Sequence, residues 1–545
     1  MKVPVSTLAL AAGALAAAAL LGLGAAAARA ADDAAAAKTA AAPGTDTRPL
    51  SARLTPDDIT RLLAGPSEER PLGAAEAVRG TLDANPGLVA YRLSELRARE
   101  SLAGAKAALY LPSVSGSIGY DLSSSIATST LSMVDVIDSK SFHWTVGLSE
   151  PLPSGGTVSL SSSDARYFTN DEALLPELRT SFGASVTVAV SQPLLRGCCI
   201  KPPRAGVLLA GDDLRYARLV LQRALNQVAA DVLNAYWDLA FAHRDLELKR
   251  AAIANLDARA AWTERSIAEG RIAKTDAIQV ATSRAAAVAD YLAAVNSLLD
   301  AEEHLKTLIG LKDAGPGTRT RPLPKDDPPA PAGAPPAPDD VYAAAAARNY
   351  DLLVLRAELG RKKLERVLAR DAFWPSLDLW AGYTFRGTGA DRGAELMDLA
   401  DPGTKSWGVG LSFSYPLFDT PSKAAARAAD HALRAKETEL AYAERALHEE
   451  VDRVVRAVVA LRTTMELLGD RRALAEKTLA AEEEKFAVGR STLKDLLDFQ
   501  EGLERARVAE AHARYDLAKG LVALDRVQGT LVGVVGVTTA GSEGG

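Results

Sequence analysis

The side chains that carry out most enzymatic chemistry are sparse in this sequence and form no recognisable set. Its six histidines are scattered over 545 residues, at positions 143, 243, 304, 431, 448 and 512. His448-Glu449-Glu450 lacks the second histidine, four residues along one helix face, that a zinc protease needs. Neither a serine nucleophile elbow nor a phosphate-binding loop stands out. We therefore predict that the protein is not an enzyme and requires neither a catalytic metal nor a cofactor.

The remaining reactive groups have structural interpretations. The only two cysteines are the adjacent pair Cys198-Cys199, which excludes a disulfide scaffold. A disulfide between neighbours would be strained, and two thiols fit the sequence equally well. The run Glu482-Glu483-Glu484 predicts a solvated helix face. The net charge of −6 gives no basic surface for nucleic acid.

The first residues have the pattern of an export signal. Lys2 is followed by an Ala/Leu run that ends in Ala28-Arg29-Ala30, so we predict a secretory signal peptide over residues 1–30. A membrane-anchor helix is the alternative for the same run. Residues 31–70 are rich in Ala, Pro, Asp and Arg without periodicity and predict a flexible leader. No later run of about twenty apolar residues follows, so any entry into a membrane must use β-structure.

Two regions alternate apolar with small or polar residues, which is the pattern of strands with one apolar face. In the first region the alternation begins at Val114, Phe142, Val158 and Phe182, and in the second at Leu377 and Trp407. Each strand is expected to be nine or ten residues long. The connections 123–141, 166–180 and 387–404 are expected as long polar loops, whereas residues 153–156 form a short turn. Aromatic residues that would suit membrane interfaces are Tyr120, Trp144, Trp380, Tyr383 and Trp407.

Long helical segments with a narrow apolar stripe surround both strand regions. The order helix, strands, long helix, break at Gly270 or Gly489, helix occurs twice. We therefore predict an internal duplication. Its parts are a first repeat over 71–312 with strands at about 113–192, a Pro-rich linker over 313–338, a second repeat over 339–530 with strands at about 376–416, and a flexible tail over 531–545.

The one-faced strands predict a membrane β-barrel wall, apolar toward lipid and small-polar toward a water-filled lumen. Six strands cannot enclose a lumen, so several chains must contribute to one barrel. The long helices carry Arg, Glu and Lys on their other faces and must extend into an aqueous compartment. The predicted fold class is an α+β membrane protein. A β-barrel shared between chains continues into a long α-helical, coiled-coil barrel.

At this point the sequence resembles the TolC/OprM family of outer membrane factors over about residues 72–531. The similarity is carried by the duplicated layout, by EGRIAKTDAIQVA and VGRSTLKDLLDFQ at the breaks, and by joints between helices and strands centred on Pro112, Pro193, Pro375 and Pro416. The family implies a homotrimer in the outer membrane of a Gram-negative cell, with a periplasmic extension. It serves as the exit duct of tripartite efflux pumps or type I secretion systems. Its partners are a periplasmic adaptor protein, an inner-membrane RND or ABC transporter, and outer-membrane lipid.

The first half departs from the family pattern, which has two strands there, because the sequence indicates four. The extra hairpin, at about 142–166, either joins the barrel, giving six strands from each chain, or folds into an outer loop or the periplasmic end.

The resemblance also implies a gate at the breaks between helices. Acidic residues that face the pore in the family match Asp495 and Asp498, which are three residues apart and so share a helix face. The alternative is a pair of ordinary solvated acids near a helix start. Polar links between neighbouring hairpins match Asp276 and Arg490, while Phe486 replaces a family tyrosine. Ser491 stands where the family has an arginine.

The breaks also match the family's contacts with its adaptor. The adaptor contacts then lie at Gly270, Arg271, Gly489 and Arg490, and glycine at each break permits a positive φ. Efflux and secretion are not separated by the sequence, nor is the substrate defined. The competing interpretation is a soluble periplasmic coiled-coil adaptor or structural protein, which shares the helical hairpins but needs no one-faced strands.

Overall fold

A computed structural model describes residues 54–65, 67–126, 134–170, 180–198, 201–312, 319–329, 336–401, 405–415, 417–418 and 420–534. The predicted signal peptide lies outside these ranges, as do Cys199 and Pro416. Contacts divide the chain into two compact units. The smaller consists of Met1–Thr60 with Ile253–Asp290, and the larger of Arg61–Ala252 with Tyr291–Gly545.

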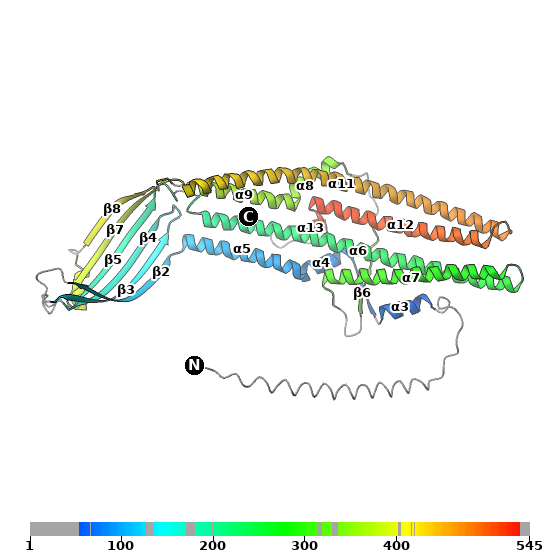
Figure 1. Cartoon of the computed structure of the whole chain (residues 1–545), viewed down its shortest axis with the longest axis horizontal. Helices are drawn as coiled ribbons and strands as arrows, with labels where there is room; N and C mark the ends of the chain where they lie inside the picture. Colours follow the sequence, from blue (N-terminus) through cyan, green and yellow to red (C-terminus); the bar gives the residue numbers. More distant parts are fainter. Residues whose placement is uncertain are drawn as a thin grey trace, which may run out of the picture. The chain divides into compact units, whose positions relative to one another are not determined.

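The larger unit contains a six-stranded antiparallel sheet in the order β2-β3-β4-β5-β7-β8 (Figure 1). Its strands are β2 (Ser113–Ile126), β3 (Val136–Pro151), β4 (Thr157–Thr169), β5 (Thr180–Pro193), β7 (Ser376–Gly389) and β8 (Lys405–Ser414). The extra hairpin, β3–β4, lies inside this sheet, so the alternative in which it folds away is wrong. Most strands are longer than predicted, and the connections are correspondingly shorter, because pairing continues through the Ser/Thr-rich ends.

The register separates the side chains of the sheet into two chemical classes. One row across all six strands consists of Val114, Leu148, Leu160, Val188, Tyr383 and Trp407. The adjacent row points to the opposite face and consists of Ser115, Gly147, Ser161, Thr187, Thr384 and Ser406. Hydroxyl groups pair across the strands on this second face, as between Thr187 and Thr384 at 3.0 Å. The alternation predicted for single strands is therefore a property of the whole sheet.

Two aromatic residues illustrate the difference between the faces. Trp407 lies on the apolar face and is 75% exposed. Trp380 pairs with Ser191 and Gly410, which places it on the hydroxyl-rich face. The prediction that Trp380 belongs to an apolar interfacial girdle is therefore wrong, because its position in the strand has the opposite parity.

Helices lead into and out of the sheet. The chain enters β2 from α4 (Ala74–Ala84) and α5 (Pro86–Tyr110), and enters β7 from α8 (Pro338–Arg348) and α9 (Tyr350–Asp371). It leaves β5 through α6 (Ala205–Ala268), followed by α7 (Lys274–Ile309), and leaves β8 through α11 (Thr420–Ala487), followed by α12 (Leu493–Gln528). Asn85-Pro86 separates α4 from α5, as the missing proline donor predicted. In Figure 1, α9 and α12 both run alongside α11.

Two apolar clusters hold the helices of the larger unit together. One is centred on the α6 stretch that contains Val232, Tyr236 and Leu239, against α4 and the last turns of α7. The other joins α8 and α9 to Val451 of α11 and Val527 of α12. A short helix, α13 (Leu531–Val534), adds Leu531 to the first cluster. The predicted flexible tail therefore begins too early, since Leu531 is 1% exposed.

The predicted leader and linker contain secondary structure that their composition did not predict. The leader holds α3 (Pro56–Ala64) and β1 (Ser67–Leu72), and the linker holds β6 (Arg319–Pro324), which pairs in parallel with β1. Neither strand shows an alternation of apolar and polar residues. Each is stabilised by backbone pairing to a segment some 250 residues away in the sequence, and no local pattern reveals that pairing.

Buried polar contacts fix this small sheet to the helices. The hydroxyl of Tyr236 accepts hydrogen bonds from the backbone amides of Lys325 and Asp326 at 3.2 and 3.1 Å. Burial raises the pKa of Tyr236 to about 12. Arg321 of β6 forms a buried ion pair with Glu302 of α7 at 2.8 Å.

The smaller unit contains the distal parts of α6 and α7. Ile253, Val280 and Val288 form buried apolar positions in it. An ion pair between Asp257 and Arg284, at 2.5 Å, links the two helical arms. None of the helices in the described ranges is both long enough and apolar enough to cross a membrane.

Candidate functional site: the hairpin ends and the polar junction

Both predicted breaks are helix ends of the same kind. Gly270 and Gly489 have φ values of +74° and +72°. At the first, the amide of Arg271 donates to Ser266 O and that of Gly270 to Ile267 O. At the second, Arg490 donates to Lys485 O and Gly489 to Phe486 O. This is the Schellman pattern, which requires a left-handed residue just past the helix. The positive φ expected at both glycines is confirmed.

The helices that follow the breaks start differently. Thr492 caps α12, because its hydroxyl accepts from the Asp495 amide at 3.2 Å and donates to the Asp495 carboxylate at 2.6 Å. Hydrogen bonds from the hydroxyl and then the amide of Thr492 lower the pKa of Asp495. Ala273 occupies the corresponding position before α7, and its methyl side chain cannot accept a hydrogen bond from the Asp276 amide.

Asp495 therefore has a structural role besides the one predicted for it. Asp495 and Asp498 are both exposed, while Leu496 and Leu497 between them are buried. The two acids thus share the solvent face of α12, as their spacing predicted. Whether that face borders a pore stays a prediction.

Glu482 is a tip residue that sequence reasoning missed. It is 7% exposed, whereas Glu483 and Glu484 are exposed, so the solvated face predicted for the acidic run is wrong at its first member. Its carboxylate accepts from the Ser491 hydroxyl and pairs with Lys485 at 2.9 Å. These two partners, Lys485 first, lower the pKa of Glu482. No local pattern predicts the link, because Ser491 reaches Glu482 only after the chain has turned.

The other predicted tip residues are spread over both units. Asp276 is half-buried in the first turn of α7 and belongs to the smaller unit, together with Arg271, which pairs with Glu269 at 2.8 Å. Phe486 is half-buried and Arg490 is exposed, and both belong to the larger unit. The link predicted between Asp276 and Arg490 stays a prediction.

Three of the four predicted joint prolines are described. Pro112 separates α5 from β2, and Pro193 ends β5. Two backbone hydrogen bonds connect the Pro193 joint to that of Pro375: Leu194 donates to Leu377 O at 2.7 Å and Arg196 to Pro375 O at 3.4 Å. The return joint of the first strand set is thereby tied to the entry joint of the second.

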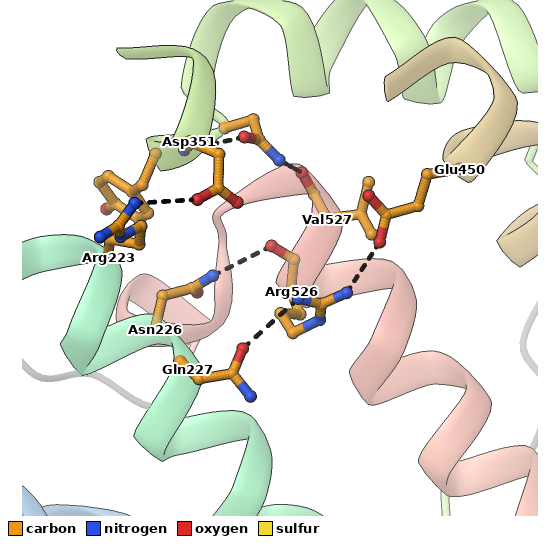
Figure 2. Close-up of a pocket in the computed structure, with 9 residues that line it drawn as sticks. Arg223, Asn226, Gln227, Asp351, Glu450, Arg526 and Val527 are labelled. Atoms are coloured by element: carbon orange, nitrogen blue, oxygen red, sulfur yellow. Dashed lines mark hydrogen bonds and ion pairs between the residues drawn. The ribbon is translucent and has the colours of Figure 1, made fainter. Parts of the chain in front are cut away.

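A polar junction lies where α12 ends against α6, α9 and α11 (Figure 2). Arg526 donates to Glu450 of α11 at 2.8 Å and to Gln227 of α6 at 3.4 Å. The backbone carbonyl of Arg526 accepts from Asn226 at 3.0 Å. This carbonyl also accepts from the Gly529 amide at 3.1 Å, so the junction adds a second hydrogen bond at the end of α12 and fixes that end to its neighbours.

Asn349 completes the junction, and Asn85 repeats its contacts in the first half of the chain. Asn349 caps α9 by accepting from Asp351 N, and donates to Val527 O of α12 at 3.0 Å. Asn85 caps α5 by accepting from Gly87 N, and donates to Leu308 O of α7 at 3.3 Å.

An arginine seven residues after each of these asparagines makes an equivalent contact. Arg92 donates to Leu82 O and Arg356 to Ala346 O, the carbonyl three residues before each asparagine. Together these contacts support the predicted duplication at the level of single hydrogen bonds.

Among the residues that the structure describes, no group of three or more His, Cys, Asp or Glu side chains could hold a metal ion. The candidate functional features of the described residues are the exposed acids, the helix ends, and the sheet with one apolar and one hydroxyl-rich face.

Residues 341–530 match the family of outer membrane efflux proteins. Solved structures of similar fold include CusC, with 15% identity, coverage of 84% of this chain and 91% of that chain, and a TM-score of 0.60. The CmeC outer membrane channel of Campylobacter jejuni is 15% identical, with 84% and 85% covered and a TM-score of 0.57. The outer membrane protein VceC of Vibrio cholerae is 16% identical, with 84% and 96% covered and a TM-score of 0.57. No curated protein sequence matches this chain. The resemblance to outer membrane factors that the sequence indicated is confirmed.

Proposed function

We propose that this protein is an outer-membrane exit duct that carries substrates from the periplasm to the cell exterior. The observation that carries the proposal is the division of the six-stranded sheet into one apolar and one hydroxyl-rich face. On the outermost strands, Ile118 and Val114 of β2 and Leu411 of β8 are 64–75% exposed. Such a face is stable against lipid, and the opposite face suits water.

The duct would form from three copies of the chain. Within one copy β2 and β8 each have a single neighbour in the sheet, so each leaves a row of backbone groups unpaired. Pairing β8 of one copy with β2 of the next removes these edges. Three copies would bring eighteen strands, six from each, and barrels of this size enclose an aqueous channel.

The helices would continue this tube below the membrane. α11 has 68 residues, which at 1.5 Å per residue gives roughly 100 Å. Its ion pairs with α9, such as Arg366 with Asp430 at 2.6 Å, require an aqueous surface. A periplasmic extension of this length supports a role in bridging to inner-membrane partners. The partners proposed are a periplasmic adaptor, contacting Gly270-Arg271 and Gly489-Arg490, and an RND or ABC transporter.

The gate is proposed at the periplasmic end. In a trimer Asp495 and Asp498 would form two carboxylate rings, which favour cations in a narrow pore. Because Asp495 also belongs to the Thr492 cap, the test variant is Asp495→Asn/Asp498→Asn, which keeps the acceptors and removes the charge. We expect weaker cation selectivity and weaker block by multivalent cations in single-channel recordings. Glu483→Gln/Glu484→Gln is the matched control, and equal behaviour of the two variants would remove the rings from the gate.

The proposed link between Arg490 and Asp276 of neighbouring hairpins is tested by Arg490→Ala and by Asp276→Asn. Both variants should raise single-channel conductance by loosening the closed end. Unchanged conductance in both would exclude this lock and leave the duct itself unaffected.

The competing function is a soluble periplasmic adaptor or structural protein. Its decisive test is fractionation of cells without detergent, followed by reconstitution of the purified mature chain in planar lipid bilayers. A duct co-purifies with the outer membrane as a trimer and gives stepwise conductance. A water-soluble monomer with no conductance would overturn the proposal. Whether the route serves efflux or type I secretion then depends on the transporter captured with the adaptor.

A further inference from the structure

A short helix lies on the apolar face of the sheet, at the end farthest from the long helices. This helix, α10 (Arg392–Leu399), belongs to the connection between β7 and β8. Its backbone lies directly over two glycines: a Cβ at Gly387 would lie 2.3 Å from Glu395 O, and one at Gly389 would lie 2.5 Å from Glu395 N. Gly387 is in register with Ala184 and Asp164, four residues beyond Tyr383 on the same face.

Polar contacts fix α10 in this position. Asp391 caps it by accepting from Ala394 N at 2.9 Å, and Asp398 accepts from Thr388 N of β7 at 2.8 Å. Arg392 pairs with Asp164 of β4 at 3.3 Å. The helix is therefore anchored to two strands that are not adjacent in the sheet, and it covers Ala184 between them.

α10 turns Glu395 and Leu399 toward the sheet and two large apolar side chains away from it. Glu395 turns toward the sheet and is 1% exposed, and within the described part of the chain neither of its carboxylate oxygens has a hydrogen-bond partner. Leu396 and Met397 point away from the sheet and are 60% and 80% exposed. In water the apolar side of such a helix would face the protein. An outward side with two exposed large apolar residues is more stable against an apolar environment than against water.

The height of α10 on the wall identifies that environment. Ten residues separate Leu377, at the inner end of β7, from Gly387. At about 3.3 Å per residue and a tilt near 40°, they rise roughly 25 Å, which is the height of the apolar band of a membrane barrel. α10 thus lies at the outer boundary of this band, with exposed Asp391 and Arg392 at its start. Helices of this polarity lie at the junction of headgroups and acyl chains.

We propose that α10 is an interfacial helix that inserts Leu396 and Met397 into the outer leaflet of the membrane and fixes the vertical position of the duct. The occupant of this surface is lipid, because the surface continues the apolar face of the sheet. This inference rests on the proposed function, since it requires that face to be the lipid-facing wall.

The test uses an environment-sensitive fluorophore on single cysteines in the full chain, with Cys198→Ser and Cys199→Ser as background. The labelled variants are Met397→Cys on α10, Leu411→Cys on the apolar face of β8, and Val488→Cys at the end of α11. Each is reconstituted in phosphatidylcholine vesicles with brominated acyl chains, and aqueous iodide is the second quencher. All three positions are more than 60% exposed in one chain, so labelling leaves the core intact.

We expect the labels at 397 and 411 to be quenched several-fold more by the brominated lipid than the label at 488, and that at 488 to be quenched mainly by iodide. Iodide quenching at 397 with lipid quenching at 411 would overturn the inference and leave the duct intact. Quenching at 397 by neither agent would mean that protein covers α10, and would overturn it too. Absence of lipid quenching at both 397 and 411 would overturn the proposed function itself.

Discussion

At the scale of single residues, the two hairpin ends differ in one side chain that decides how firmly the second helix begins. Both ends use glycine in a left-handed conformation to close the first helix. Only the second has a hydroxyl, on Thr492, to open the next one. The tip of α11 and α12 is therefore the better fixed of the two, and the tip of α6 and α7 has an uncapped start at Ala273.

Replacing Thr492 by Ala should destabilise the start of α12 by about 1 kcal/mol, because the amide of Asp495 loses its acceptor. The measurement is hydrogen exchange of amides 493–497, which should become faster than in the wild type. The reciprocal variant Ala273→Thr recreates the same spacing with Asp276 and should slow exchange at the start of α7. Unchanged exchange in both variants would show that these caps contribute nothing to the tips.

Glu482 makes the second tip sensitive to acid. Its folded-state pKa lies below the unfolded value of 4.5, because Lys485 and Ser491 stabilise the carboxylate. Its contribution to stability is therefore complete above about pH 4.5 and is lost as the pH falls through the lowered folded value. The protection of tip amides from exchange should fall over this range in the wild type and less so in Glu482→Gln. Glu484→Gln, an exposed neighbour, should retain the wild-type dependence, and a common profile for all three proteins would contradict this role.

At the scale of elements, α10 depends on two glycines of β7. A methyl group at Gly387 would overlap the backbone of Glu395 and Leu399, whereas one at Gly382 would meet its nearest neighbour, Val188 O, at 3.9 Å. Gly387→Ala should therefore displace α10, at a penalty of about 1–3 kcal/mol from overpacking. We expect faster proteolysis of the connection between β7 and β8, measured with the purified protein in detergent. Gly382→Ala is the matched control, and equal cleavage of both would mean that α10 does not need this close approach.

The strands were the elements most directly predictable from the sequence, because their period of two is local. Among the elements that the sequence missed, β1, β6 and α10 share a different property. β1 and β6 are paired with each other, and α10 is fixed through Asp164 and Thr388. Their stability comes from partners distant in sequence, or from a sheet surface that exists only after folding. A short stretch of sequence does not show which distant residues these partners are.

At the scale of the whole molecule, the edge strands of the sheet bear on the proposed assembly of three copies. β2 and β8 lie at opposite ends of the strand order, and each retains unpaired backbone groups. Parity also constrains the assembly, because the apolar faces of adjoining copies must lie on the same side.

Cysteine pairs across these edges test the assembly. In a background without Cys198 and Cys199, we combine Ser113→Cys, Ser115→Cys or Ser117→Cys of β2 with Ser412→Cys or Ser414→Cys of β8. All these positions have the hydroxyl-face parity, so at least one pair should form an intermolecular disulfide and yield a covalent trimer in denaturing electrophoresis. Pairing Ser115→Cys with Leu411→Cys, on opposite faces, is the control. Cross-linking of this control alone, or a ladder beyond three chains, would contradict a closed trimeric wall.

The sequence by itself determined the period of each segment, and therefore which residues share a face of a strand or helix, where glycine and proline end the helices, and that the same order of elements occurs twice. These are consequences of backbone geometry within a few residues. Only the tertiary structure decided that β3 and β4 join one continuous sheet, that Glu482 is buried against Ser491, and that α10 turns its apolar side outward. Each of these depends on backbone hydrogen bonds or desolvation between residues brought together by folding, and the identity of such partners is not encoded in local spacing.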